Sequence, residues 1–226
     1  MRASSSTTRP HAAALLSLFL LAWTGWAAAA QITATVTDQE GRPLADAVVV
    51  AVPVQGVAPS APLAAREIVD QIRQEFVPYV KPVLVGTSVF FPNKDNIRHQ
   101  VYSFSPAKQF ELPLYAGTPA RPVVFDRPGV VVLGCNIHDW MIAYIYVSES
   151  PYFAKTGADG KAQLVDLPAQ GYRVRVWHPR LQGSESATQK PADLGADARA
   201  ELSWKLELKA EMRVRRAPVP GSRGHY

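Results

Sequence analysis

"GVVVLGCNIHDWMIAYIYV", residues 129–147, decides the fold and holds the only cysteine of the chain. Two apolar runs rich in valine, isoleucine and tyrosine flank a short polar interruption, a pattern that predicts two β-strands joined by a tight loop. The loop carries Cys135, with His138 three residues later and Met141 three residues after that. On whole-chain frequencies this spacing arises by chance roughly once in 3,000 trials, so we interpret it as one functional cluster.

A thiolate, an imidazole and a thioether on one loop are ligands for copper, because soft sulfur favours Cu(I) and imidazole suits both oxidation states. Such a site needs a second histidine from another segment. His99 is the candidate, since it opens a strand-like run after the turn-forming residues 92–96. We therefore predict one type 1 copper site with His99, Cys135 and His138 in a trigonal plane and Met141 as a long axial ligand.

Each of these residues also has a plainer interpretation when it is taken alone. Cys135 could be a buried, inert thiol, Met141 could be a core residue, and His99 an ordinary strand residue. His178, in "VWHP", has no partner at metal-ligand spacing, so we expect it to be structural.

At these residues the chain resembles the cupredoxins, small blue-copper electron-transfer proteins. The resemblance covers about residues 66–148 and includes "FPNKDNIRH", residues 91–99, which is similar to the turn and strand that supply the family's first histidine. The C-x2-H-x2-M loop is similar to the short loop of the amicyanin type, and the segment also resembles exported plastocyanin-like proteins labelled as methylamine utilisation proteins. The resemblance implies a one-electron carrier with redox proteins as partners, and not an enzyme.

Three further positions follow from the resemblance. Cupredoxins commonly carry asparagine after the first histidine, where its amide ties the two ligand loops together, whereas this chain has Gln100. Asp139 stands where amicyanin-type loops usually have proline, and it would place negative charge beside the imidazole of His138. Trp140 could form part of an apolar docking patch around that histidine.

The flanking sequence resembles a carboxypeptidase regulatory-like domain, a transthyretin-type β-sandwich. "ATVTDQEGRPLADAVVVAVP", residues 34–53, resembles its first half, and "KTGADGKAQLVDLPAQGYRVRVWHP", residues 155–179, its second. We therefore expect an all-β protein in which a cupredoxin Greek-key β-sandwich (66–148) is inserted in, or lies next to, a discontinuous sandwich (31–60 and 149–210). In the cupredoxin part we expect residues 83–91 to form one strand of a hairpin with residues 99–105. In the flanking part we expect residues 198–208 to form an edge strand. Residues 66–80 fit a helix or a strand.

The first thirty residues of the chain predict export. Residues 1–30 begin with arginines, continue through an apolar run shorter than the roughly 20 residues of a spanning helix, and end in four alanines. These features are typical of a cleaved secretory signal, with a membrane anchor as the alternative, so we expect cleavage near Ala30 and a periplasmic protein without a transmembrane segment.

The charge pattern excludes nucleic acid as a partner. The Pro- and Gly-containing basic tail (211–226) has four arginines and no acid within residues 213–226; removing these arginines, Arg2 and Arg9 from the net charge of +5 leaves −1 for the body, so there is no basic face. Two other functions stay open: a copper-binding or delivery protein, and a β-sandwich interaction module without functional metal.

Overall fold

The computed structural model describes residues 30–56, 65–119, 121–195 and 198–211 of the chain. Within these ranges every regular element is a β-strand, apart from a short 3₁₀ helix, η1, at Glu185–Thr188. The all-β class expected from the sequence is therefore confirmed. The predicted leader and nearly all of the predicted basic tail lie outside the described residues.

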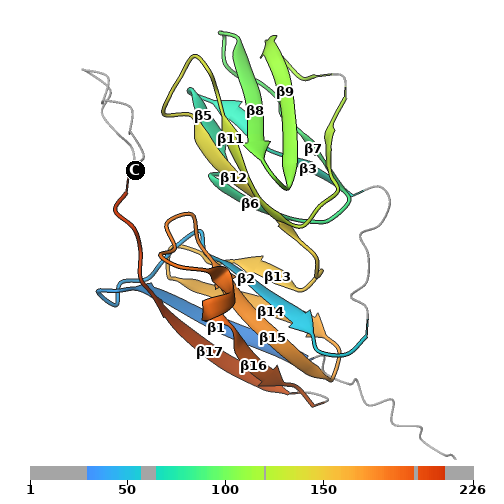
Figure 1. The fold of residues 1–226 in the computed structure, drawn as a ribbon, viewed down its shortest axis with the longest axis vertical. Helices are drawn as coiled ribbons and strands as arrows, with labels where there is room; N and C mark the ends of the chain where they lie inside the picture. Colours follow the sequence, from blue (N-terminus) through green and yellow to red (C-terminus); the bar gives the residue numbers. More distant parts are fainter. Residues whose placement is uncertain (1–29, 57–64, 120, 196–197, 212–226) are drawn as a thin grey trace, which may run out of the picture.

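Residues from both ends of the described chain form a lower β-sandwich (Figure 1). One sheet has the order β14-β1-β17 and the other the order β13-β2-β15-β16, and a single apolar core lies between them. The strands are β1 (Ala30–Asp38), β2 (Val48–Pro53), β13 (Phe153–Lys155), β14 (Lys161–Leu167), β15 (Gly171–Trp177), β16 (Lys190–Asp193) and β17 (Arg199–Leu206). β1 alternates strictly between buried and half-buried residues, as a strand with one face on a core must.

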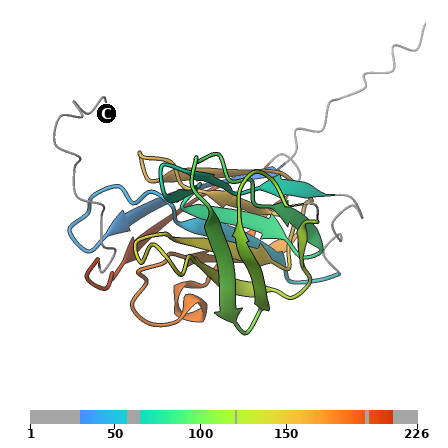
Figure 2. The ribbon, with the colours of Figure 1, turned by 90° about the horizontal axis from the view of Figure 1, so that it is seen from above.

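The middle of the chain forms an upper β-sandwich (Figure 1). A five-stranded sheet, β6-β12-β11-β8-β9, faces a three-stranded sheet, β10-β7-β3, and a separate hairpin pairs β4 with β5. The strands are β3 (Arg66–Ile68), β4 (Asp70–Ile72), β5 (Glu75–Val77), β6 (Val80–Leu84), β7 (Thr87–Phe90), β8 (His99–Ser105), β9 (Lys108–Tyr115), β10 (Val123–Phe125), β11 (Gly129–Gly134) and β12 (Ile142–Ser148). Seen from above, β8 and β9 lie in front of the other strands, at the end of the molecule away from the lower sandwich (Figure 2).

Two local predictions are wrong, and one is settled. The expected single strand 83–91 is broken at Gly86, which has φ +91° and turns the chain from one sheet of the upper sandwich into the other. Because β7 and β8 then belong to different sheets, the expected hairpin does not form, and β8 pairs with β9 and β11 instead. The ambiguous segment 66–80 forms short strands. The expected edge strand near 198–208 is confirmed as β17, which pairs in parallel with β1 alone.

The two sandwiches meet through a small apolar cluster. Val48 and Val50 of β2 pack with Val80 and Tyr146 from the upper sandwich, and Trp177 of β15 stacks against this group. Among the described residues no helix is long and apolar enough to cross a membrane.

Candidate metal centre

Three of the four predicted ligands converge at the end of the upper sandwich. One potential ligand atom from each of His99, Cys135 and His138 lies within 4.8 Å of the others, the one such group found among the described residues. Cys135 Sγ lies 3.9 Å from His138 Nδ1, and the two imidazole ring centroids are 4.9 Å apart. Side chains separated by 36 residues in the chain are therefore close enough to share one ion.

Local backbone structure explains the position of each side chain. β8 begins at His99, and its alternation turns His99 and Val101 into the core while Gln100 points outward. Cys135 directly follows the last residue of β11 and is buried. The backbone N–H of Met141 donates to His138 O at 2.9 Å, so the loop closes tightly and returns Met141 to the core before β12 begins.

Met141 belongs to the same buried apolar cluster as Cys135 and is 1 % exposed. The structure therefore places the thioether in the core at the end of the ligand loop. His138 is half-buried, and it is the member of the cluster that reaches the surface.

The hydrogen bonding of His99 shows how the cluster fits a metal ion. The side chain is fully buried, and its Nε2 lies 2.8 Å from Asp95 Oδ2. Because a carboxylate only accepts, Nε2 carries the proton and Nδ1 keeps its lone pair. Nδ1 is buried and has no hydrogen-bond partner among the described residues. An unpaired buried acceptor costs about 1–3 kcal/mol, and a metal ion bound at Nδ1 would remove this cost.

The three residues predicted around the ligands lie in different surroundings. The Gln100 amide donates to Glu111 Oε1 at 2.6 Å on the outer face of the sheet, so it does not join the two ligand loops. Asp139 is exposed on the ligand loop. Trp140 is half-buried, its ring centroid lies 5.2 Å from that of His138, and its Nε1–H donates to Gln74 O at 3.1 Å. Trp140 therefore contacts the protein more than solvent.

Nothing in the sequence predicts a role for Asp95 beside His99, or for the β4–β5 turn that Trp140 reaches. The only signal for Asp95 is an acidic residue in the quoted turn, four positions before His99. Gln74 carried no signal, since only its backbone takes part.

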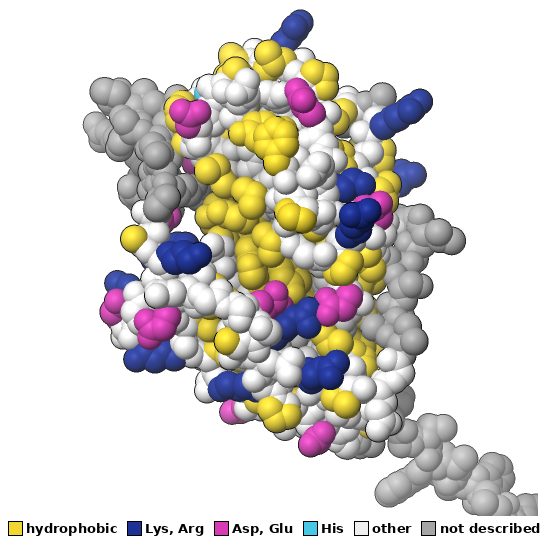
Figure 3. Space-filling view, in the orientation of Figure 1, with side chains coloured by type: hydrophobic (Ala, Val, Ile, Leu, Met, Phe, Trp, Pro, Cys, Tyr) yellow, Lys and Arg dark blue, Asp and Glu magenta, His cyan; other side chains and the backbone are white. Residues whose placement is uncertain are grey.

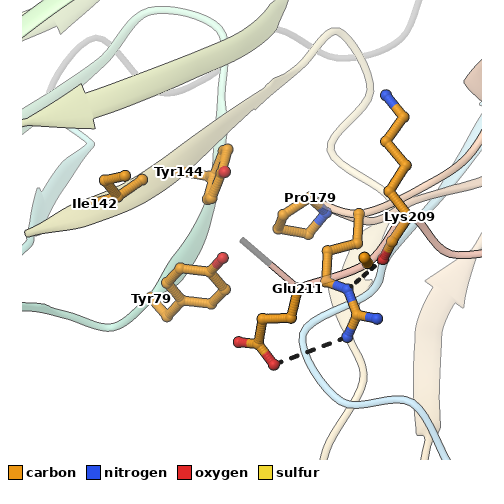
Figure 4. A pocket seen from close by; sticks show the side chains of 8 residues that line it. Tyr79, Ile142, Tyr144, Pro179, Lys209 and Glu211 are labelled. Carbon is orange, nitrogen blue, oxygen red and sulfur yellow. Dashed lines mark hydrogen bonds and ion pairs between the residues drawn. The ribbon is translucent and has the colours of Figure 1, made fainter. Parts of the chain in front are cut away.

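A cavity of about 320 Å³ lies away from this cluster, at the junction of the two sandwiches (Figure 4). Its apolar wall is formed by Tyr79, Tyr144 and Pro179. The guanidinium of Arg180 donates to the backbone oxygen of Lys209 at 2.8 Å and forms an ion pair with Glu211 at 4.0 Å. Two of its charged groups, Arg180 and Glu211, are thus paired with each other. A second shallow hollow is lined by Tyr102, Phe104 and Val132. Figure 3 shows that apolar side chains gather on the visible face of the upper sandwich.

Comparisons with known proteins gave matches only among solved structures. No protein-family model and no curated protein matches the chain. A copper-containing nitrite reductase from Thermus scotoductus SA-01 is 28 % identical over 43 % of this chain and 25 % of its own, with a TM-score of 0.35. A purple cupredoxin from Nitrosopumilus maritimus is 24 % identical over 37 % of this chain and 99 % of its own, with a TM-score of 0.32. A reduced mutant of amicyanin is 20 % identical over 44 % of this chain and 98 % of its own, with a TM-score of 0.33. The chain thus spans a quarter of the nitrite reductase, and the two small copper proteins span less than half of this chain.

Proposed function

We propose that this chain is an exported type 1 copper protein that carries single electrons between redox proteins. Two observations support the proposal: one ligand atom from each of His99, Cys135 and His138 lies within 4.8 Å of the others, and the buried Nδ1 of His99 has no hydrogen-bond partner among the described residues. His99 Nδ1, Cys135 Sγ and His138 Nδ1 would hold the ion, and the Met141 thioether would be the weak fourth ligand. Bound copper would supply one chemical property, the gain and loss of one electron.

The protein's own residues would keep this site rigid and dry. Cys135 and Met141 are packed in the apolar core of the upper sandwich, which excludes water from the sulfur side of the cluster. Because one ligand atom of each of the three residues lies within 4.8 Å of the others, little movement is needed to hold an ion. We propose a carrier and not a catalyst, with residues 66–148 as the copper-binding part and the carboxypeptidase regulatory-like part as a scaffold.

Electrons would enter and leave at His138, since it is the ligand that reaches the surface. Ile97, from the His99 loop, and Ile137, beside His138, are 38 % and 49 % exposed. We infer that these apolar side chains form the contact surface for transient redox partners, with Trp140 held behind them. The periplasmic location rests on the leader predicted for residues 1–30.

Copper loading of the purified protein tests the proposal. Addition of Cu(II) should produce an intense blue thiolate-to-copper band and a narrow copper hyperfine splitting, which Cys135→Ser abolishes. His178→Asn, which changes a buried histidine outside the cluster, should leave both signals intact. A colourless complex with Cu(I) alone would instead support a delivery protein, and absence of copper binding would support an interaction module; either result overturns the electron-carrier proposal.

A further inference from the structure

The β4–β5 hairpin has an unusual turn next to the candidate metal centre. Its two turn residues, Arg73 and Gln74, have φ angles of +54° and +61°. A two-residue hairpin turn with both residues in the left-handed region is normally built from Asn-Gly or a similar pair, because other side chains are strained there. Neither Arg73 nor Gln74 relieves this strain, so contacts from outside the hairpin must help to hold the turn.

The first of these contacts comes from the segment that carries His99. Asp95 Oδ1 accepts the backbone N–H of Arg73 at 2.6 Å, and Oδ2 accepts that of Gln74 at 2.7 Å. The same Oδ2 lies 2.8 Å from His99 Nε2. The carboxylate therefore joins the turn to the first ligand.

Asp95 is itself held in place by its own loop. The backbone N–H of Asp95 donates to Asn93 Oδ1 at 3.0 Å, and the Asn93 amide donates to Ile97 O at 2.8 Å and Tyr115 O at 2.9 Å. The carboxylate thus projects from a fixed loop.

The second contact comes from the loop that carries the other ligands. The indole N–H of Trp140 donates to Gln74 O at 3.1 Å, and Trp140 stands between His138 and Met141 in the chain. Figure 1 shows β5 beside the loop that joins β11 to β12. The 73–74 turn is therefore hydrogen-bonded to both ligand-bearing segments. Its two backbone N–H groups donate to Asp95 in the His99 segment, and the carbonyl of Gln74 accepts from Trp140 in the Cys135–Met141 loop.

We propose that the turn of Arg73 and Gln74 is a clip that fixes the two ligand loops to each other, with Asp95 and Trp140 as the positioning residues that attach to it. This inference rests on the proposed copper function. The clip supplies the connection between the loops that the amide at position 100 does not make, since that amide bonds to Glu111. Asp95 also fixes the His99 tautomer, keeping the proton on Nε2 and the lone pair on Nδ1.

A clip that acts through one shared turn predicts coupled effects. Asp95→Asn removes one of the acceptor oxygens and should weaken Cu(II) affinity by about 10- to 100-fold, the usual effect of losing the partner of a ligating histidine. Trp140→Phe keeps the ring against His138 but removes its hydrogen bond, and should weaken affinity about fivefold. In the Asp95→Asn background one of the two hydrogen bonds that anchor the turn is already lost, so Trp140→Phe should have a clearly smaller further effect than in the wild type.

Matched substitutions control for side-chain chemistry. Asp126→Asn removes a carboxylate paired with Lys108 at 3.0 Å at an exposed position of the upper sandwich. Trp204→Phe removes an indole hydrogen bond to Thr188 O at 2.6 Å in the lower sandwich. Neither should change copper affinity or the copper hyperfine splitting, and circular dichroism should show that all variants are folded.

The experiment combines a copper titration of the four-member mutant cycle with ¹⁵N NMR of the His99 ring in the copper-free protein. In the wild type the spectrum should show the proton on Nε2, and in Asp95→Asn a mixture of tautomers. The clip is disproved if the two substitutions act independently on affinity, or if the His99 tautomer does not depend on Asp95. Failure of the wild type to bind copper would overturn the proposed function instead, and the tautomer measurement would still test the attachment of His99 to the clip.

Discussion

His178 provides a quantitative test of how the two buried histidines differ. It follows β15, is 6 % exposed, and accepts the backbone N–H of Arg180 at its Nδ1 at 3.2 Å. Burial lowers the pKa of His178 to about 4, and the charge of Arg180 adds to this, while Asp46 and Glu211 act weakly in the opposite direction. The imidazole should therefore be neutral in the folded protein at neutral pH.

The pKa difference determines how stability depends on pH. In the unfolded chain a histidine titrates near pH 6.5, about 2.5 units above the folded value. The folded state binds this proton more weakly than the unfolded state, so the contribution is complete above pH 6.5 and is lost as the pH falls toward about 4. At about 1.4 kcal/mol per unit, the free energy of unfolding should fall by about 3 kcal/mol over this range from His178 alone.

His178→Asn tests this reasoning, because the asparagine oxygen can replace Nδ1 as an acceptor without titrating. We expect urea unfolding between pH 4 and 7.5 to show a much smaller loss of stability in the variant than in the wild type. Direct NMR titration of the His178 ring should give a pKa well below 6.5. An equal pH dependence in the two proteins, or an ordinary imidazole titration, would refute the argument.

Four further variants test other parts of the structure. Met141→Leu should keep the blue band and raise the reduction potential, because the weak axial sulfur stabilises the oxidised ion; voltammetry that shows a lower potential would contradict this. Ile137→Lys should slow electron transfer to partner proteins about tenfold, the equivalent of about 1.4 kcal/mol of apolar contact, while leaving the potential unchanged in stopped-flow and voltammetric measurements. Arg73→Asn combined with Gln74→Gly should raise the free energy of unfolding by about 1 kcal/mol, since asparagine and glycine adopt left-handed φ angles more readily than arginine and glutamine. A decrease in urea unfolding would show that the turn is not strained. Trp177→Ala should remove about 2–3 kcal/mol from the contact between the sandwiches, and calorimetry should show two separate transitions rather than one unchanged transition.

The sequence predicts those features of the upper sandwich that depend on neighbouring residues. β8 begins at His99, where the sequence places the start of a strand, and β12 begins directly after Met141. The Cys135–His138–Met141 spacing is local, so a tight loop brings its members together wherever the strands lie. The turn and strand around His99, together with the resemblance, make it the candidate second histidine, but its approach to Cys135 depends on strand pairing across 36 residues, which leaves no local pattern in the sequence.

Features that depend on the path of the chain between sheets could not be predicted in this way. The run 83–91 reads as one β-branched segment, and only the left-handed Gly86, whose N–H donates to Phe125 O at 2.7 Å, shows that it crosses from one sheet to the other. Likewise, β1 pairs with β17 at the opposite end of the described chain. Asp95 was visible as a turn residue, but its attachment to Gln74 depends on backbone groups that every residue type possesses.

Burial of the lone thiol does not by itself distinguish an inert core cysteine from a metal ligand, because Cys135 packs among apolar neighbours in either case. The distinction comes from the histidines. At His178 the buried Nδ1 accepts a backbone N–H, which is how a structural histidine satisfies its lone pair. At His99 the Asp95 carboxylate accepts the proton of Nε2, and the buried Nδ1 has no hydrogen-bond partner among the described residues. A buried acceptor without a partner costs stability, and a cation bound at Nδ1 would remove that cost, which is the physical ground for the proposed metal site.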